Sequence, residues 1–309
     1  MPPNPIYAIS AERSVTNPLI TFASCTTLDG NINGPSVIKV PSWIKNPKGK
    51  YYMYFAHHEG NYIRLAYSDA LIGPWQIHPP GTLRLDQAKG FHGHIASPDV
   101  HVDDEKQEIR MYFHGRLENL RSKQKSGVAI SKDGLAFTQV PGILGPPYFR
   151  VFRWKTHDYA IDGSGRFSRS KDGLTRFRSR GWVIPALRHA AVLIQGDMLL
   201  CFYSRIGDAP EGIMVSTLQL NGNWKSWTAT APLDVLKPEK DYEGTQFPIK
   251  ASKSGIGTKV QELRDPCIYQ EDGRVYLFYS YAGEMGIAMA ELDIKIAPIH
   301  PPVVPPQAI

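Results

Sequence analysis

The amino-acid sequence contains only three cysteines: Cys25, Cys201 and Cys267. Their odd number and their spacing exclude a disulfide-stapled secreted domain and a cysteine-rich metal site. Two of them lie inside apolar strand patterns, so we expect reduced, mostly buried thiols.

Long apolar runs are also missing. The longest, such as Ala190–Ile194, are far shorter than the roughly 20 residues that cross a bilayer. The N-terminal sequence Met-Pro-Pro-Asn-Pro-Ile-Tyr lacks the basic residues and apolar run of a secretory signal. We therefore expect a cytoplasmic protein with no membrane partner.

Charge of one sign is not concentrated in the chain. The formal net charge is +6, but lysines and arginines are scattered, with one modest cluster at 121–125. This scatter argues against a nucleic-acid partner, while the mild basic excess favours an anionic substrate. Hydrophobic residues make up 42% and charged residues 21%, which excludes disorder and collagen-like structure.

No long amphipathic helix is visible, and short β-branched and aromatic stretches alternate with turns instead. The stretch 95–115 contains two such strands around a polar turn, and four other stretches repeat this pattern. The turn Lys132-Asp-Gly-Leu recurs as Lys171-Asp-Gly-Leu, and Asp-Gly between strands is a strong hairpin signal. An internal repeat of this kind is typical of radially repeated sheets.

Five units of about four short antiparallel strands predict an all-β fold, a single five-bladed β-propeller over residues 1–309. A large β-sandwich, or two of them, is the alternative. The blades are expected to begin near residues 34, 97, 148, 188 and 264. We expect the outer strand of the fourth blade at 224–227, an insertion at about 231–261 and a proline-rich tail at 296–309. The fifth blade shows three strands, and Leu19–Ala23 is a candidate for its missing outer strand.

The first strand of each propeller blade lines the central channel. Aligning the units places a first ring of residues at the channel mouth: Gly34, Ser97, Tyr148, His189 and Asp265. Two residues further along the same strand face lies a second ring: Ser36, Asp99, Arg150, Ala191 and Cys267. The second strands return to the same end of the channel and carry His57 with His58, His114 with Arg116, Arg205 with Asp208, and Tyr281 with Glu284.

Several short motifs resemble the five-bladed glycosidases of glycoside hydrolase family 43 and its relatives, families 32 and 117. The motifs are Pro98-Asp-Val-His101, Arg264-Asp-Pro266 and second strands of the type Tyr51-Tyr-Met-Tyr-Phe55. As a blade pattern, the resemblance spans nearly the whole chain. It implies hydrolysis of a carbohydrate at the channel mouth, and it places Asp99 at the position of an aspartate that tunes pKa values.

The chain departs from family 43 at two catalytic positions. The aspartate base of that family precedes the proline of the first blade, where this chain has Gly34. The general-acid glutamate of the family lies in the third blade, where this chain offers Tyr148, Arg150 and Asp162. Asp265 occupies the pre-proline position of the fifth blade, adjacent to the first in a closed ring, and is the candidate replacement carboxylate.

Glycoside hydrolysis needs one ionised and one protonated group on opposite sides of the scissile bond. Unequal burial can separate the pKa values of Asp99 and Asp265. Glu243, on the insertion, is the first candidate for the general acid. His189 is the second, because relatives in family 117 are thought to use histidine and its pKa lies near neutrality.

Each catalytic candidate also has a purely structural explanation. Asp99 can pair with Arg150 of the next blade, and Asp265 before a proline can cap a turn. His189 can bond to a neighbouring strand, and Glu243 can be exposed on its insertion.

Substrate contacts are expected from basic and aromatic residues at the mouth: His58, His94, His114, Arg150, Arg188, Arg205, Arg264, Tyr148 and Tyr281. The histidines at 57, 58, 92 and 94 suit transition metals, but no carboxylate spacing accompanies them, so no metal and no cofactor is predicted. A bound ion or water deeper in the channel, near His101, is an alternative.

The leading hypothesis is therefore a glycoside hydrolase acting on a small oligosaccharide. A glycoside phosphorylase or transglycosylase on the same scaffold is an alternative, and phosphate-dependent turnover would distinguish a phosphorylase. The third alternative is a non-catalytic propeller that binds carbohydrate or protein. It predicts that salt bridges engage both Asp99 and Asp265.

Overall fold

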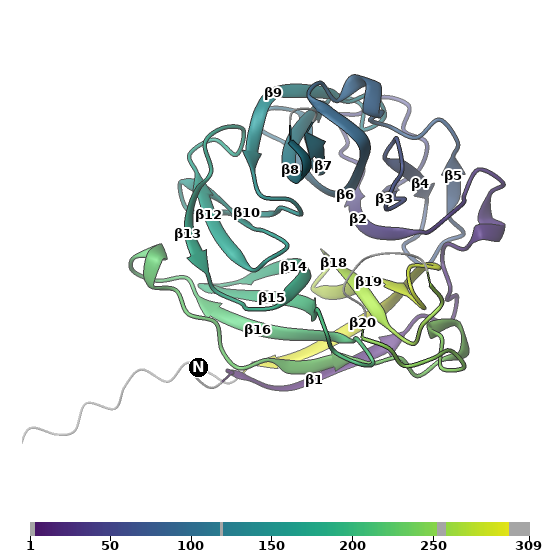
Figure 1. Ribbon diagram of the computed structural model, residues 1–309, viewed down its shortest axis with the longest axis vertical. Helices are drawn as coiled ribbons and strands as arrows, with labels where there is room; N and C mark the ends of the chain where they lie inside the picture. The colour runs from purple at the N-terminus through teal and green to yellow at the C-terminus, as the bar shows by residue number, and fades with distance from the viewer. Residues whose placement is uncertain (1–3, 118–119, 252–257, 297–309) are drawn as a thin grey trace, which may run out of the picture.

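The computed structural model describes residues 4–117, 120–251 and 258–296, and it shows five four-stranded antiparallel sheets arranged radially (Figure 1). This confirms the predicted all-β, five-bladed β-propeller.

Blade 1 contains β2 (Asn33–Lys39), β3 (Tyr51–Ala56), β4 (Arg64–Ser68) and β5 (Gln76–His78). Blade 2 contains β6 (Phe91–Asp103), β7 (Glu108–Leu117), β8 (Leu120–Ser131) and β9 (Thr138–Gly145). Blade 3 contains β10 (Arg150–Trp154), β11 (His157–Ile161), β12 (Arg166–Ser170) and β13 (Arg178–Trp182). Blade 4 contains β14 (Leu187–Gln195), β15 (Met198–Arg205), β16 (Ile213–Gln219) and β17 (Leu233–Leu236). Blade 5 contains β18 (Leu263–Glu271), β19 (Arg274–Tyr281), β20 (Gly286–Ile296) and β1 (Ile6–Arg13).

The ring closes through the N-terminal strand β1, which pairs antiparallel with β20 from Ile6 opposite Ile296 to Arg13 opposite Ala290. Figure 1 shows purple β1 running alongside yellow β20. An N-terminal segment therefore supplies the outer strand, but Leu19–Ala23 is the wrong segment. Exposed and half-buried positions alternate along residues 8–13, as an outer strand requires. The segment Leu19–Ala23 instead meets blade 5 through one isolated β-bridge, between Ile20 and Ile287.

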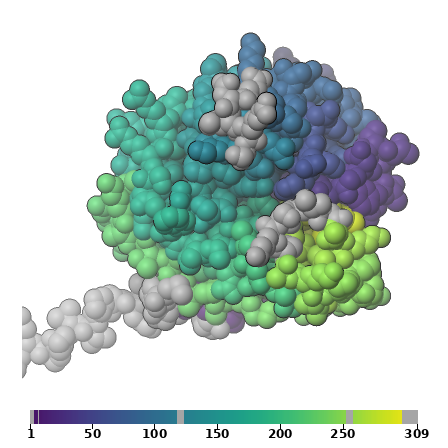
Figure 2. Space-filling model, in the orientation of Figure 1, coloured from purple at the N-terminus to yellow at the C-terminus, as the bar shows by residue number. Residues whose placement is uncertain are grey.

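The hydrophobic core consists of five clusters, each between two adjacent blades. Strand β3 shows how the sequence produces this arrangement, because successive side chains point to opposite faces of a sheet. Tyr52 and Tyr54 pack against blade 2, while Tyr51, Met53 and Phe55 pack against blade 5. A strand buried on both faces is apolar throughout, which explains the uninterrupted aromatic run. The space-filling view shows yellow-green blade 5 packed between green blade 4 and purple-blue blade 1 (Figure 2).

The repeated Asp-Gly turn joins the third and fourth strands of blades 2 and 3. In both copies a serine hydroxyl donates to the aspartate Oδ1, and that same oxygen accepts from the amide two residues beyond the aspartate. Gly134 and Gly173 adopt nearly equal positive φ angles of 73° and 71°. The sequence repeat is therefore a structural repeat.

The outer strand of blade 4 differs from the expectation. Residues 224–227 contain the 3₁₀ turn η3 (Trp224–Ser226), and the outer strand is β17, inside the predicted insertion. Trp224 and Trp227 instead pack against Tyr159 of blade 3, with ring centroids 5.9 and 4.9 Å apart. Bulky aromatic burial between blades thus replaces strand pairing. Of the predicted proline-rich tail at 296–309, residues 297–309 lie outside the described residues.

The described helices are four short 3₁₀ turns: η1 (Phe22–Ser24), η2 (Leu85–Gln87), η3 and η4 (Asp241–Glu243). Within the described ranges, no helix has the length and apolarity needed to span a membrane. Cys201 and Cys267 are buried, Cys25 is half-buried, and all three are free thiols, as expected.

Candidate active site

The two predicted residue rings occupy different depths of the channel. All five second-ring residues line a cavity of about 410 Å³, whereas the described lining contains no residue of the first ring. Gly34, Ser97 and Asp265 each have a positive φ and are each followed by a proline at an interruption of the first-strand ladder. The sequence alignment of these blades is therefore reproduced in three dimensions.

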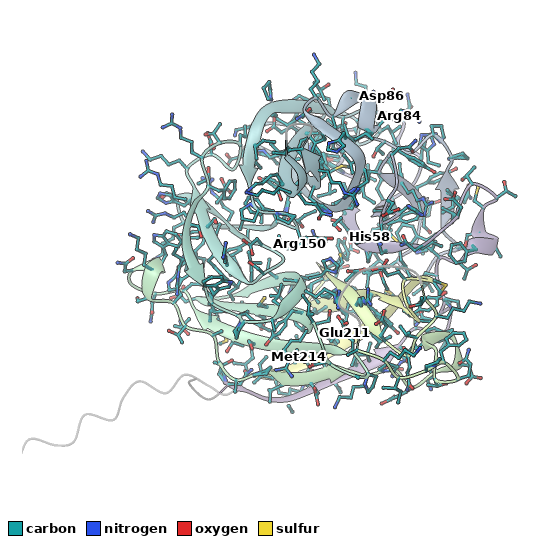
Figure 3. All side chains as sticks on the ribbon, in the orientation of Figure 1. His58, Arg84, Asp86, Arg150, Glu211 and Met214 are labelled. Carbon is teal, nitrogen blue, oxygen red and sulfur yellow. The ribbon has the colours of Figure 1, made fainter. Side chains whose placement is uncertain are left out.

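Arg150 crosses the channel and connects three blades. Its Nε donates to the carbonyl of Ala190 at 2.9 Å, and its Nη1 donates to the carbonyls of Ser97 and Phe149 at 3.2 and 3.1 Å. Figure 3 shows Arg150 and His58 toward the centre of the ring, far from Arg84 and Asp86 at the rim. Two of the three guanidinium nitrogens of Arg150 thus bind backbone carbonyls, while the buried Nη2 has no partner among the described residues.

Asp99 lies in the cavity, and one oxygen of its carboxylate is engaged by two partners. Its Oδ2 lies 2.9 Å from Nε2 of His101 and accepts from the Val151 amide at 2.7 Å. Burial opposes ionisation, but the charge and hydrogen bond of His101 outweigh it and lower the pKa of Asp99. Asp99 in turn raises the pKa of His101 despite burial. The structure therefore gives Asp99 an ion pair within blade 2 and a bond to blade 3.

Asp265 lies at the mouth on β18 with φ 49°, a left-handed conformation that aspartate tolerates better than most residues. Its Oδ1 contacts Nδ1 of His189 on β14. Burial disfavours the charge, but His189 and then Arg264 lower the pKa of Asp265. Burial also lowers the pKa of His189, although Asp265 opposes this change. At neutral pH the pair is therefore an ionised aspartate in contact with a neutral imidazole.

Glu284 faces the same mouth from the turn between β19 and β20. Ala282, Gly283 and Glu284 all have positive φ angles, a strained arrangement of the kind that clusters at functional sites. Oε2 of Glu284 accepts from Asn33 at 2.9 Å, and Oε1 lies 3.1 Å from Nη1 of Arg264. Burial and then the charge of Asp265 raise the pKa of Glu284 to about 8. Glu284 is therefore mostly protonated at neutral pH.

A cluster of buried carboxylates surrounds Arg188 and Arg264, two of the four arginines predicted to bind substrate. Arg264 lies 2.6 Å from Glu262 and 3.7 Å from Glu211, and Nε of Arg188 donates to Glu211 at 2.8 Å. Burial raises the pKa of Glu211 to about 7 and also raises that of Glu262. A parallel bridge between Glu211 and Glu262 joins blade 4 to blade 5. Both guanidinium groups are thus held inside the protein.

A row of three imidazoles, here called the imidazole row, consists of His58, His94 and His114. The centroids of His58 and His94 are 6.5 Å apart, and those of His94 and His114 are 5.6 Å apart. Tyr148 continues the row, with its ring 3.9 Å from His114 and 4.6 Å from His189. Burial lowers the pKa values of His58 and His94 to about 4 and that of His114 further. The row is therefore neutral and leads to Asp265.

The structure places Glu243 outside this mouth and fully buried, which corrects the expectation of an available acid or an exposed loop residue. Its oxygens accept from Nε and Nη2 of Arg13 at 2.7 and 2.9 Å, from Tyr279 at 2.8 Å and from two backbone amides. These partners include none of the groups around Asp265. Glu243 has a structural role, because β1 brings the half-buried guanidinium of Arg13 to it.

One predicted contact residue also lies elsewhere, and another is paired with a neighbouring carboxylate. Tyr281 packs into the core between blades 4 and 5, with its ring 5.4 Å from Tyr242. The apolar packing of β19 determines this position. Arg205 is partly exposed and paired with Asp208 at 3.2 Å.

Among the described residues, no group of three or more histidine, cysteine, aspartate or glutamate side chains could hold a metal ion. The buried carboxyl groups of this region to which sequence reasoning gave no role are Glu284, Glu211 and Glu262. Glu284 was expected at the mouth but received no role, and the available signal was its position after Gly283 at the end of a second strand. Nothing local distinguishes Glu211 or Glu262, because their burial depends on Arg188 and Arg264.

The mouth thus combines two carboxyl groups whose environments move their pKa values in opposite directions. Asp265 is an ionised carboxylate, and Glu284 is a carboxylic acid that holds its proton at neutral pH. Such a divergence assigns one group as base or nucleophile and the other as acid. The arrangement is competent for general acid–base chemistry on a bond placed between them.

No protein-family model matches the sequence. The uncharacterized protein R118 of Acanthamoeba polyphaga mimivirus is 36% identical over 318 residues, which cover 91% of this chain and 89% of the viral protein. Solved structures share the fold at low identity. An exo-β-1,3-galactanase from Phanerochaete chrysosporium with bound β-1,3-galactotriose has a TM-score of 0.58 and 13% identity over 93% of this chain. This chain spans 64% of the galactanase chain. A family 43 β-xylosidase/α-arabinofuranosidase from a compost metagenome, bound to xylotriose, has a TM-score of 0.61 and 13% identity over 93% of this chain and 98% of its own.

Proposed function

Because this chain belongs to the family of the uncharacterized mimivirus protein R118, we propose a function from its own geometry: it is a glycoside hydrolase that acts at the channel mouth. The observation that carries this proposal is the pair of buried carboxyl groups with divergent pKa values, Asp265 and Glu284. Structures with the same propeller fold hold oligosaccharides, galactotriose in one case and xylotriose in another. Both observations support a carbohydrate substrate.

In the proposed reaction the glycosidic carbon–oxygen bond breaks between the two carboxyl groups. Glu284 gives its proton to the leaving-group oxygen, and Asp265 assists attack at the anomeric carbon, either directly or by taking a proton from water. Water supplies the hydroxyl group of the new sugar end and gives up one proton. That proton restores Glu284 directly when Asp265 has acted as the nucleophile, and after its release from Asp265 when Asp265 has acted as the base. His189 positions Asp265 through the contact between Nδ1 and Oδ1.

Glu284 fits the acid role better than either candidate named from the sequence. Glu243 is saturated by Arg13, Tyr279 and two backbone amides. His189 has a lowered pKa and is neutral at pH 7. Glu284 has the raised pKa that an acid needs to hold its proton near neutrality.

The test is turnover of a panel of glycosides by the wild type, Asp265→Asn and Glu284→Gln. We expect each variant to lose about 10²–10⁴-fold in kcat, the usual contribution of a positioned acid or base. Glu105→Gln is the matched control, because Glu105 is exposed in the turn between β6 and β7. If Glu284→Gln retains wild-type kcat while the control does as well, Glu284 is not the acid.

A non-catalytic carbohydrate-binding propeller is the second candidate, and a specific observation favours it. Asp99 is paired with His101, and Asp265 is in contact with His189. Asp99 is thus held in an ion pair, as that alternative predicts, whereas the partner of Asp265 is a neutral imidazole. Binding of oligosaccharides by the wild type without turnover of any glycoside would support this candidate over the hydrolase.

A further inference from the structure

The imidazole row contains buried polar atoms without partners. His94 and His114 are 2% and 1% exposed. Nε2 of His94 and both ring nitrogens of His114 have no hydrogen-bond partner among the described residues. Buried polar groups nearly always form hydrogen bonds, and a buried donor or acceptor without a partner costs free energy. Two neighbouring imidazoles with this property indicate a place where a ligand supplies the missing bonds.

The charge state of the row restricts that ligand. A neutral imidazole offers one N–H donor and one lone pair, and a sugar hydroxyl offers the complementary acceptor and donor. An anionic ligand needs cations, but the guanidinium groups of Arg188 and Arg264 are engaged with buried carboxylates. The neutral imidazoles and the pairing of Arg188 and Arg264 therefore favour an uncharged ligand over the anionic substrate suggested by the overall charge.

The position of the row connects it to the carboxyl pair. His58 is half-buried in the turn after β3, while His94 and His114 lie deeper, on β6 and β7. The ring of Tyr148 contacts both His114 and His189. Burial and then the charges of Glu284 and Asp265 raise the pKa of its hydroxyl. A sugar unit bound along the row would thus be adjacent to the groups proposed to act on its linkage.

We propose that His58, His94 and His114 form a subsite that binds an uncharged sugar unit through its hydroxyl groups, with Tyr148 as the wall facing Asp265. This assignment rests on the proposed function, since it extends the same mouth. It selects neutral glycans and discriminates against uronic acids and sulfated sugars.

The experiment measures binding of the full-length protein to an array of neutral and acidic oligosaccharides, followed by calorimetric titration of the best neutral glycan. We expect the wild type to bind neutral glycans in preference to their uronic-acid counterparts. His114→Leu should weaken binding about tenfold or more, and His114→Gln, which keeps a donor and an acceptor, should lose less. His157→Leu, a histidine at the start of β11 and outside the row, is the control and should bind like the wild type.

Binding of acidic glycans as tight as that of neutral ones would overturn the proposal, as would wild-type affinity in a folded His114→Leu variant or no binding to any neutral glycan. Failure of the proposed function gives a different result. Selective binding of neutral glycans that depends on His114, without turnover of any glycoside, would support the subsite and refute the proposed hydrolase activity.

Discussion

Substituting Glu284 by glutamine should change how the stability of the protein depends on pH. In the folded protein the pKa of Glu284 is raised to about 8, by burial first and by the charge of Asp265 second. In the unfolded chain a glutamate has a pKa of about 4.3. The stability contributed by the protonated group is complete below the unfolded pKa. It is lost as pH rises toward the folded pKa, because unfolding then releases a proton.

The magnitude follows from the separation of the two pKa values. Each pH unit between them lowers the free energy of unfolding by about 1.4 kcal/mol, so Glu284 alone accounts for about 3 kcal/mol between pH 5 and pH 7. Glu211, with a pKa raised to about 7, acts in the same direction. Asp265 has a lowered pKa, so its contribution to the free energy of unfolding is lost only at pH values more acidic than this interval of pH 5 to pH 7. The difference between wild type and Glu284→Gln therefore isolates Glu284.

The assay is urea unfolding followed by tryptophan fluorescence at pH 5, 6, 7 and 8. The wild type should lose more stability than Glu284→Gln across this range, and the gap between the two curves should change by about 3 kcal/mol from pH 5 to pH 7. Glu105→Gln should run parallel to the wild type, since Glu105 is exposed. Parallel curves for Glu284→Gln and wild type would refute the claim that Glu284 is buried as an acid.

Two further predictions concern residues that the structure separates from the mouth. Arg13→Met should lower the free energy of unfolding by about 3–5 kcal/mol in urea, because it leaves buried Glu243 without its cation; a loss below about 1 kcal/mol would contradict the buried pair. Asp99→Asn should lower stability by about 1–3 kcal/mol through its bonds to His101 and Val151. It should leave the alkaline limb of the pH–rate profile in place, and a shift of that limb would show that Asp99 acts at the mouth.

The fold was predictable because its determinants are local and repeated. Strand β3 reads as an apolar run bounded by turns, and the turns at Asp133 and Asp172 use the same hydrogen bonds. The depth of the two channel rings followed from the two-residue period of a strand. The outer strands were harder to predict, since β1 and β17 are short amphipathic segments and nothing local identifies their partners.

The candidate site was only partly predictable, because charge and burial there depend on distant segments. Asp265 and His189 were identified, and they are in contact. Glu243 received an acid role that its partner Arg13, 230 residues away in sequence, makes unsuitable. A glutamate read alone gives no indication of its pKa, since that value depends on the charges that folding brings near it.

Closure of the ring assembles the carboxyl pair as well as completing blade 5. The carboxylate of Glu284 accepts from Asn33, 251 residues earlier in the chain, and its carbonyl accepts from the amide of Ile32 at 2.7 Å. Both contacts exist only where blade 1 meets blade 5, and β1 holds this end of the chain in place through its pairing with β20. Arg13, at the end of β1, is in turn fixed by Glu243. Glu243, which sequence analysis named as the first candidate for the general acid, therefore serves the site indirectly, because its ion pair with Arg13 stabilises the closure that keeps Glu284 buried beside Asp265.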